Sequence, residues 1–291
     1  MTESPSVQWF PGHMAKTRKM IRSALPLVDG IIEVTDARIP VSSRNPEIVS
    51  LTAGKPLMIL LNKADAADEK ATSLWIDHYR KNGIIAAAAD CRSGKGLNRL
   101  VPLVRELLSD VIEKNRAKGM SGRMLRLMVV GIPNVGKSSF INRMAGRKKA
   151  KVEDRPGVTR EKQWVTLDKD LELLDMPGVL WPKFEDKLVG ERLAFTGAVK
   201  DDILDSEALA CRLLEELSVN YLDALKTRFP KITDDAADGY ELLEQAGRSR
   251  GMLVSGGGIN TERAAAAVID EFRSGKIGRI TLELPDTAEG G

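Results

Sequence analysis

Three short segments carry side chains whose types and spacing suit the handling of a phosphorylated nucleotide. The first, Gly131-Ile-Pro-Asn-Val-Gly136-Lys137-Ser138, follows the apolar run LRLMVV and precedes the helical pattern KSSFINRM. Strand, glycine-rich turn and helix in this order predict a P-loop, whose backbone N–H groups surround phosphate oxygens. Lys137 is then expected to reach the terminal phosphates, and the Ser138 hydroxyl to ligate Mg²⁺.

The second segment, Asn62-Lys63-Ala64-Asp65, ends the apolar run PLMILL and predicts selection of guanine. The Asp65 carboxylate can accept hydrogen bonds from N1–H and N2–H₂ of guanine, a donor pair that adenine lacks. We expect the Lys63 stem to lie along the base plane and Asn62 to tie this loop to the P-loop. The same residues are common in ordinary turns, which is the alternative for the tetrapeptide taken alone.

The third segment, Asp175-Met-Pro-Gly178, follows the strand-like run LELL. Asp175 stands where a Walker B carboxylate supports Mg²⁺, and the Gly178 amide is expected to sense the γ-phosphate. Thr159, in the intervening RPGVTR, is predicted to complete the metal shell while γ-phosphate is present, so residues 150–163 form a candidate switch. The alternative for Thr159 is a plain turn residue.

The elements that must position these segments alternate between strands and helices. Strand-like runs cover residues 30–34, 56–61, 84–89, 125–130 and 171–174. Helical patterns cover residues 14–25, 68–81, 97–114 and 137–145. The alternation predicts an α/β fold with a mostly parallel sheet covered on both faces. Beyond residue 187 helical patterns at 206–217, 236–248 and 261–272 predict a small all-helical domain.

Composition favours two domains and excludes several classes of protein. The chain has 291 residues, of which 43% are hydrophobic, and a net charge of +3, which excludes a polycation. Residues 187–291 hold 13 basic and 19 acidic side chains, against 31 and 22 in residues 1–186. We therefore predict a domain at 1–186, with an N-terminal arm at 1–14, and a second domain at 187–291. Two cysteines, short apolar runs and no leader-like start predict a cytoplasmic protein with no membrane partner.

The order of the three segments is unusual. Small GTPases present the P-loop first and the guanine-reading motif last, whereas here Asn62–Asp65 precedes the P-loop by about seventy residues. This order predicts a circularly permuted P-loop GTPase domain whose original ends are joined through residues 113–126 and whose new cut follows Gly178. The γ-phosphate sensor then leads almost directly into the helical domain, which hydrolysis is able to reposition.

The chain closely resembles the ribosome biogenesis GTPase A family of circularly permuted GTPases. The resemblance rests on ordered segments: WFPGHMAK (9–16), DARIP (36–40), SSRNP (42–46), LLNKAD (60–65), GIPNVGKS (131–138), DRPGVT (154–159), LLDMPGVLWPKFED (173–186) and LAFTGAVKD (193–201). It implies a GTPase of late large-subunit maturation that is stimulated by the preribosomal particle. It also implies binding to that particle in the GTP state, release after hydrolysis, and recognition of ribosomal RNA, with residues 187–291 as an RNA- or ribosome-binding domain.

One loop departs from the family pattern. Where Ser-Ala usually stands beside the guanine carbonyl, this sequence has Asp90-Cys91, which leaves open which backbone amide meets the guanine oxygen. The predicted GTP contacts are therefore Asn62, Lys63, Asp65, Asp90, Cys91, Asn134, Val135, Gly136, Lys137, Ser138, Ser139, Thr159 and Gly178. The predicted Mg²⁺ ligands are Ser138, Thr159 and Asp175.

The group that positions the attacking water is also unusual. Ras-like enzymes use a glutamine directly after DxxG, but here Val179 offers neither donor nor acceptor. Of the two histidines, His13 lies in Trp-Phe-Pro-Gly-His, where proline and glycine are expected to shape a loop that carries the imidazole. The resemblance implies that His13 enters the site when the ribosome orders the N-terminus. An exposed tail histidine is the alternative.

Asn134 predicts a second cation. In related GTPases an asparagine here helps to hold K⁺ beside the phosphates, where the ion supplies positive charge. A loop-stabilising amide is the alternative.

A basic cluster predicts the partner. It consists of Arg143, Arg147, Lys148, Lys149, Lys151, Arg155, Arg160 and Lys162, flanks the candidate switch, and suits a phosphate backbone; its alternative is a solvated surface. Two other functions remain open at this point. One is a GTPase of tRNA modification or small-subunit assembly, and the other is a nucleotide-gated RNA-binding module with incidental hydrolysis.

Overall fold

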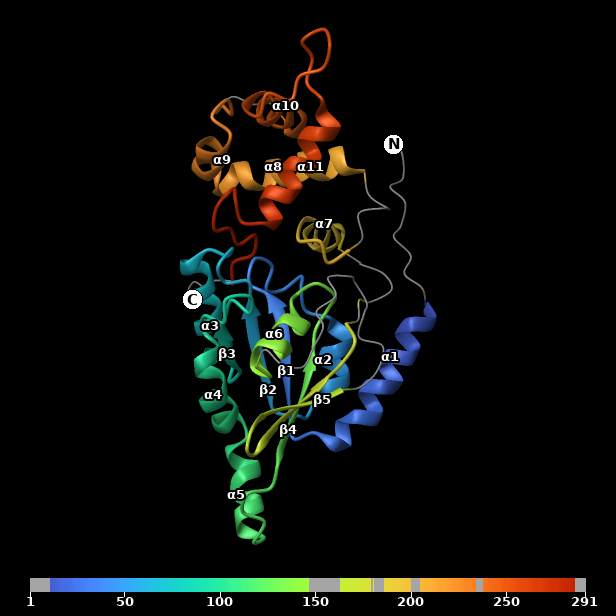
Figure 1. Ribbon diagram of the computed structural model, residues 1–291, viewed down its shortest axis with the longest axis vertical. Helices are drawn as coiled ribbons and strands as arrows, with labels where there is room; N and C mark the ends of the chain where they lie inside the picture. Colours follow the sequence, from blue (N-terminus) through green and yellow to red (C-terminus); the bar gives the residue numbers. More distant parts are fainter. Residues whose placement is uncertain are drawn as a thin grey trace, which may run out of the picture. The chain divides into compact units, whose positions relative to one another are not determined.

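The protein folds around a six-stranded sheet followed by a group of helices (Figure 1). The computed structural model describes residues 11–146, 163–178, 180, 186–199, 205–233 and 238–285, with side chains from Ala15 onward. The strands are β1 (Gly30–Asp36), β2 (Leu57–Asn62), β3 (Ile85–Ala88), β4 (Leu125–Val130), β5 (Gln163–Asp168) and β6 (Leu171–Asp175). The helices in the sheet region are α1 (Pro11–Ala24), α2 (Pro46–Thr52), α3 (Glu69–Lys81), α4 (Leu100–Leu107), α5 (Ser109–Ala117) and α6 (Lys137–Met144).

The sheet has the order β3-β2-β1-β4-β6-β5 and is parallel except for β5, which pairs antiparallel with β6. The middle strands are apolar on both faces, because helices cover both sides, and β1 is buried along its whole length. One face packs against α1 and α2 through Ile21 and Ile48. On the other face Leu108, between α4 and α5, lies against Gly30. The predicted α/β class with a mostly parallel sheet is confirmed.

Several elements differ from the sequence expectation. The edge strand β5 and the seven-residue helix α2 were not predicted, and the helix expected over 97–114 is interrupted at Leu108. Residues 113–126 were expected to be a linker, but α5 continues to Ala117 and β4 begins at Leu125. The linker expectation was therefore too long at both ends, since the two basic side chains in the last turn of α5 suit a helix C-terminus.

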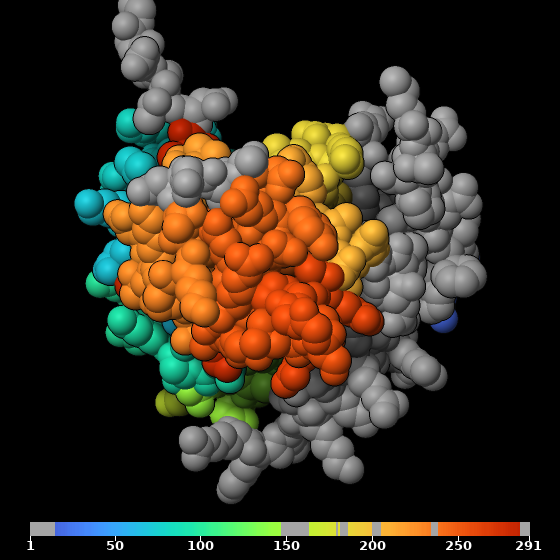
Figure 2. All heavy atoms as spheres, turned by 90° about the horizontal axis from the view of Figure 1, so that it is seen from above, coloured from blue at the N-terminus to red at the C-terminus, as the bar shows by residue number. Residues whose placement is uncertain are grey.

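The C-terminal helices form their own core. They are α7 (Lys187–Phe195), α8 (Ser206–Asn220), α9 (Leu222–Arg228), α10 (Gly239–Ser249) and α11 (Thr261–Arg273). Figure 2 shows much of their outer surface, drawn in orange and red. Phe195, Leu213, Phe229 and Phe272 are among the fully enclosed side chains. The all-helical character expected for this part is confirmed.

Acidic side chains begin several of these helices. Asp186, Asp205 and Asp238 each accept a backbone N–H bond from the first turn of α7, α8 and α10, respectively. An aspartate at this position satisfies an N–H group that has no partner within the helix and interacts favourably with the helix dipole. Part of the acidic excess after residue 187, namely Asp205 and Asp238, therefore serves helix formation rather than a partner.

Two compact units divide the chain. The first contains Met1–Asp65, Glu69–Phe184 and Glu283–Gly291, and the second contains Ala66–Asp68 and Glu185–Leu282. The sequence pattern did not predict that the chain, from Glu283 onward, belongs to the first unit again. The Glu283 carboxylate accepts backbone N–H bonds from Val41 (2.5 Å) and Ser42 (3.1 Å), and its carbonyl oxygen accepts the Trp75 indole N–H (2.8 Å). Among the described helices, none is long and apolar enough to cross a bilayer.

Candidate functional site

The predicted segments meet at the carboxyl ends of parallel strands. The P-loop follows β4, Asp175 ends β6, and Asn62 ends β2. The register places Asp175 beside Val129 of β4 and Asn62 beside Asp36 of β1. Ligands of open α/β sheets bind at this edge, so strand pairing brings together segments that are far apart along the chain.

The P-loop backbone depends on two glycines. Gly131 (φ 148°) leaves no room for a side chain, because a Cβ there would lie 2.4 Å from the carbonyl oxygen of Val34. Gly136 (φ 95°) is equally restricted, because its Cβ would lie 2.2 Å from Asn62 Nδ2. Asn134 is a non-glycine residue with φ 60°, and its side chain is exposed. The loop is thus closed tightly against β1 and against the end of β2.

Lys137 is a buried cation at the start of α6. Only 8% of the residue is exposed, and Nζ donates a hydrogen bond to the Ile132 carbonyl (2.8 Å). Burial disfavours the charged form and lowers the pKa of Lys137 to about 8, although the Asp175 carboxylate opposes this effect. A Cβ on Gly178 would lie 2.7 Å from Lys137 Nζ, so the glycine of DMPG borders this ammonium group.

The oxygen donors expected for Mg²⁺ are only partly described. Ser138 is exposed in the first turn of α6, Ser139 is half-buried, and Asp175 is buried. A hydroxyl and a carboxylate are hard oxygen donors that fit Mg²⁺, which usually takes few protein ligands and completes its shell with phosphates and water. Thr159 lies outside the described residues. Within the described residues there is no group of three or more His, Cys, Asp or Glu side chains able to hold a metal.

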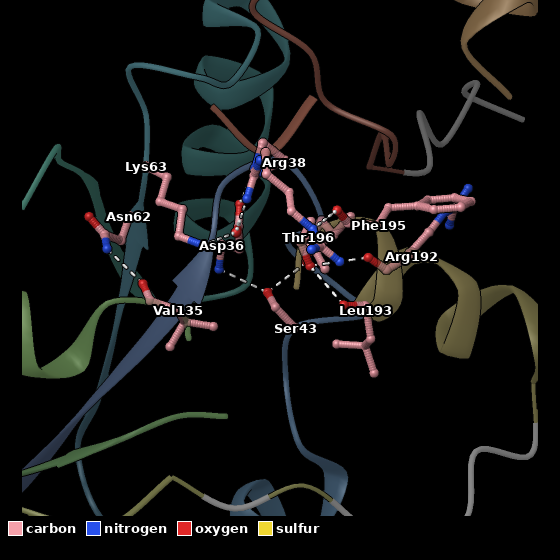
Figure 3. A network of polar contacts seen from close by, with 12 residues as sticks. Asp36, Arg38, Ser43, Asn62, Lys63, Val135, Arg192, Leu193, Phe195 and Thr196 are labelled. Atoms are coloured by element: carbon pink, nitrogen blue, oxygen red, sulfur yellow. Dashed lines mark hydrogen bonds and ion pairs between the residues drawn. The ribbon is translucent and has the colours of Figure 1, made fainter. Parts of the chain in front are cut away.

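Asn62 joins the guanine motif to two neighbouring loops. Its Nδ2 donates to the Val135 carbonyl of the P-loop (2.6 Å) (Figure 3), and its Oδ1 accepts the backbone N–H of Cys91 (3.0 Å). Asp65 is exposed three residues later. The structure thus brings Asn62 to the P-loop as expected and leaves the Asp65 carboxylate accessible to solvent.

Lys63 takes a left-handed backbone conformation (φ 60°), and its ammonium group forms an ion pair with Asp36 Oδ2 (3.0 Å). Asp36 ends β1 and is itself paired with Arg38 (Figure 3). Sequence reasoning assigned neither Asp36 nor Arg38 to the nucleotide site; it counted Arg38 with the basic residues near the N-terminus, but the side chain is buried against Asp36. The signal that points to them is an Asp-Ala-Arg run directly after a wholly buried strand, at the same sheet edge as the guanine motif.

The loop after β3 is held by its own carboxylate. Asp90 accepts backbone N–H bonds from Arg92 (2.8 Å) and Ser93 (3.2 Å), and its own N–H donates to the Lys95 carbonyl (2.9 Å). Burial raises the pKa of Asp90, but the bonds from Ser93 and Arg92 outweigh burial and leave the pKa below its ordinary value. The Cys91 amide, expected near guanine, is engaged by Asn62.

Arg143 of the basic cluster lies beside the same loop. Its guanidinium donates to the Ser93 carbonyl, and a Cβ on Gly94 would lie 2.7 Å from Arg143 Nε. The remaining members of that cluster, residues 147–162, lie outside the described residues. The expectation of one continuous basic surface therefore rests on the sequence, and Arg143 itself serves an internal contact.

His13 lies in the first turn of α1. The expectation that Pro11 and Gly12 shape a loop is therefore wrong, because α1 begins at Pro11 and proline is favoured at the first position of a helix. The His13 side chain is outside the described part of the chain.

The similarity to known proteins decides the family. Residues 126–235 match the family model of the 50S ribosome-binding GTPase. Ribosome biogenesis GTPase A of Priestia megaterium is 47% identical over 98% of this chain and 99% of its own length. The Thermotoga maritima protein of that name is 30% identical over 96% of this chain and 95% of its own length. The GNP-bound structure of YlqF from T. maritima aligns with a TM-score of 0.64 at 27% identity, over 93% of this chain and 99% of that one.

The chain belongs to the ribosome biogenesis GTPase A family. As a member of this family it is a GTP hydrolase of ribosome biogenesis, and GTPase domains in general use Mg²⁺. The expected circularly permuted P-loop GTPase fold is confirmed by the sheet topology together with these similarities. A GDP-bound YlqF structure aligns equally well, with a TM-score of 0.66 at 26% identity over 92% of this chain and 99% of that one.

Proposed function

We propose that this GTPase acts late in maturation of the large ribosomal subunit, binding a precursor particle in the GTP state and leaving it after hydrolysis. The observation that carries the proposal is the similarity, over nearly the whole chain, to ribosome biogenesis GTPase A proteins, together with the match to a family described as 50S ribosome-binding. Residues 187–291 are the proposed ribosome-contacting domain.

In this proposal the nucleotide lies along the carboxyl edge of the sheet. Asp65 reads the guanine N1–H and N2–H₂ groups, while Asn62 and Lys63 shape the base pocket with the loop at Asp90-Cys91. The backbone amides of residues 134–139 and the ammonium group of Lys137 bind the phosphates. The exposure of Asp65 and the buried position of Lys137 next to Gly178 support this division of roles.

Mg²⁺ is assigned to Ser138, Thr159 and Asp175, where it supplies positive charge at the β- and γ-phosphates. Gly178 is the proposed γ-phosphate sensor, because it borders Lys137.

The proposed water-positioning group is His13. General acid–base or positioning groups typically contribute about 10²–10⁴-fold to rate, so His13→Ala should lose roughly 100-fold of the turnover stimulated by 50S particles. GDP affinity should stay unchanged. His78→Ala is the matched control, since His78 lies on α3 between Trp75 and Tyr79. Wild-type stimulated turnover in His13→Ala would refute the assignment.

Asn134 is the proposed K⁺ ligand. The left-handed backbone and the exposure of Asn134 within the P-loop support this assignment. Hydrolysis should be faster in K⁺ than in Na⁺ for the wild type, and Asn134→Ala should abolish the difference. Equal rates in the two salts would argue against a K⁺ site.

Ribosomal RNA is the proposed surface that the protein recognises, and α1 supplies a described basic face. Lys16, Lys19 and Arg22 lie three residues apart on one side of α1 and are exposed, and no ion pair is recorded for them among the described residues. Cations spaced in this way along a helix suit a phosphate backbone. By contrast, Arg248 and Arg250 in the helical unit already pair with Glu244 and Glu271.

Sedimentation with ribosomal particles tests the whole proposal. With a non-hydrolysable GTP analogue the protein should pellet with 50S particles and not with 30S particles, and added 50S particles should accelerate GTP hydrolysis. Selective pelleting with 30S particles would favour small-subunit assembly. A hydrolysis-dead variant that still supports assembly and release would favour an RNA-binding module. Changing Lys16, Lys19 and Arg22 to glutamine should weaken pelleting and flatten its salt dependence.

A further inference from the structure

Asp36 is a buried carboxylate at the point where β1 ends, and all four of its recorded side-chain contacts are to cationic residues. Oδ1 accepts bonds from the backbone N–H (3.1 Å) and Nε (2.9 Å) of Arg38, and Oδ2 lies 2.8 Å from Arg38 Nη2 and 3.0 Å from Lys63 Nζ. Asp36 and Arg38 are each 1% exposed. The carboxylate thus faces two cations that approach from different loops.

These contacts keep Asp36 charged. Burial raises its pKa, but the positive charges of Arg38 and Lys63 outweigh burial and hold the pKa of Asp36 well below the ordinary value. The backbone at this point is fixed as well, because the Asp36 N–H donates to Ser43 Oγ (3.0 Å) and the Ser43 hydroxyl donates to the Ile39 carbonyl (2.6 Å). The carboxylate is therefore a rigid, ionised anchor.

Lys63 is the group that this anchor holds. Its backbone has φ 60°, a conformation that costs free energy for a residue with a side chain and persists where surrounding contacts enforce it. Its neighbour Asn62 lies opposite Asp36 in the β1–β2 register, which places the carboxylate beside the turn that begins the guanine motif. Asp36 therefore restrains the loop that leads to Asp65.

We infer that Asp36, held by Arg38, is a positioning residue for guanine recognition: its ion pair fixes Lys63, and with it the loop 62–65, in the conformation that accepts the base. This inference rests on the proposed contact between Lys63 and guanine. The protein alone makes the ion pair, so the base side of the site is already organised before nucleotide binds.

The same strand provides a matched control. Glu33 lies three residues before Asp36, is also 1% exposed, and also pairs with an arginine, Arg44 (2.8 Å). Among the described residues, Glu33 forms its hydrogen bond and ion pair with Arg44 and none with residues 62–65. Replacement of either carboxylate perturbs a buried ion pair on β1, but only Asp36 is linked to the guanine loop.

The test compares GDP with IDP, which lacks the N2 amino group that Asp65 is proposed to read. Asp36→Asn should weaken GDP binding about tenfold through faster dissociation and lower the preference for GDP over IDP at least threefold. Lys63→Met should weaken GDP binding to a similar extent, and the double variant should be no worse than Lys63→Met alone. Glu33→Gln should leave the GDP affinity and the preference within twofold of wild type.

Several outcomes would overturn the inference. They are additive losses in the double variant, an unchanged GDP/IDP preference in Asp36→Asn, or an equal loss in Glu33→Gln. Should Asp36→Asn fail to fold, Lys63→Arg decides, because arginine retains a charge for Asp36: affinity near wild type supports the ion pair, and affinity equal to that of Lys63→Met overturns it. If Lys63→Met binds GDP like wild type, the proposed base contact of Lys63 fails instead.

Discussion

Two lysines at the same edge of the sheet have opposite electrostatic environments: one ammonium group is paired with a carboxylate, and the other is buried against a neutral carbonyl. Lys63, on the guanine side, directs its ammonium group at the buried carboxylate of Asp36. Lys137, on the phosphate side, is buried more deeply and donates to a neutral carbonyl, and burial lowers its pKa to about 8. The positive charge of Lys63 is thus balanced by Asp36 within the protein, while that of Lys137 meets a neutral carbonyl and is only partly offset by Asp175, which leaves it for the proposed phosphate contact.

In the proposed site, this difference would provide selectivity on the guanine side and reversible binding on the phosphate side. Base recognition needs fixed geometry, which a protein-internal ion pair provides at no cost on binding. Phosphate binding needs a strong charge interaction, which is greatest where an incompletely compensated cation lies in a low-dielectric environment. In the nucleotide-free protein, the Asp36–Lys63 ion pair therefore still fixes the proposed guanine loop, whereas the buried charge of Lys137 lowers the stability of the fold.

The largest expected effect is on Lys137. Lys137→Met should weaken GDP binding by at least about 100-fold, since a bond to a charged group contributes about 1.5–3 kcal/mol and Lys137 is proposed to contact more than one phosphate oxygen. The nucleotide-free protein should unfold at the same or higher denaturant concentration, because a buried charge has been replaced by an apolar side chain. Fluorescent-GDP titration and urea unfolding measure the two effects.

Lys81→Met, at the exposed end of α3, is the control for Lys137→Met and should leave both quantities unchanged. A clear loss of stability of the nucleotide-free protein in Lys137→Met would show that the lysine charge is already compensated within the fold. The contrast with Lys63 would then disappear.

Gly136 lies where the P-loop meets Asn62 of the guanine motif. Gly136→Ala should destabilise the fold by about 1–3 kcal/mol, because it forces a side chain into a left-handed conformation against Asn62 Nδ2. It should also weaken GDP binding more than tenfold by displacing Asn62 from the Val135 carbonyl. Gly119→Ala is the control, since that glycine has a similar φ of 73° and open space around its Cβ position. Equal effects in the two variants would mean that backbone strain alone, and not the displacement of Asn62, is responsible.

The sequence predicts this edge of the sheet well because its chemistry is local. The P-loop, the guanine motif and Asp175 each follow an apolar run, and parallel strands bring such positions together whatever their order along the chain. The strand β5 was not predicted because it is a six-residue edge strand with no fully buried residue, in which only Val165 and Leu167 alternate with exposed neighbours. Helix α2 was not predicted because it is only seven residues long, with Ile48 and Thr52 as its buried residues.

The ion pair between Asp36 and Lys63 was not predicted for a different reason. Asp36 and Lys63 are 27 residues apart, and only the β1–β2 register shows that they meet. A charged residue after a strand is usually solvated, so its type alone does not indicate a buried ion pair. Contacts between loops of different strands depend on register, which a single sequence does not specify.

Replacement of Lys63 by methionine should change the stability of the nucleotide-free protein in the opposite direction to replacement of Lys137. Lys63→Met should destabilise the fold by about 1 kcal/mol, because it leaves Asp36 with Arg38 as its remaining cation, and the partial exposure of Lys63 limits the loss. Urea unfolding without nucleotide measures the difference. Lys55→Met is the control for loss of a partly buried lysine, since Lys55 donates to the Val28 carbonyl and not to a carboxylate. Destabilisation of the same sign in Lys63→Met and Lys137→Met would contradict the proposed contrast.

Near neutral pH the smallest expected effect is a pH dependence that belongs to Lys137. Because the pKa of Lys137 is about 8 in the free protein and phosphates favour its charged form, GDP binding above pH 8 should take up a proton. The affinity should then fall about twofold from pH 7 to pH 8 and approach a tenfold fall per unit above that. Calorimetry in buffers of different ionisation enthalpy measures the uptake, and Lys137→Arg controls for titration of GDP itself, since arginine stays protonated.

The lowered pKa of Lys137 has the opposite effect on the stability of the nucleotide-free protein, which should gain from a rise in pH. The folded-state pKa of Lys137 lies below the ordinary value of 10.5, so the folded state binds this proton less tightly than the unfolded chain does. The contribution of Lys137 to stability is therefore unfavourable below pH 8 and becomes less so as the pH rises from about 8 to 10.5. Affinity for GDP and the Lys137 term in stability should thus move in opposite directions over this interval. A flat affinity, or a proton uptake that persists in Lys137→Arg, would remove Lys137 as the cause and weaken the contrast with Lys63.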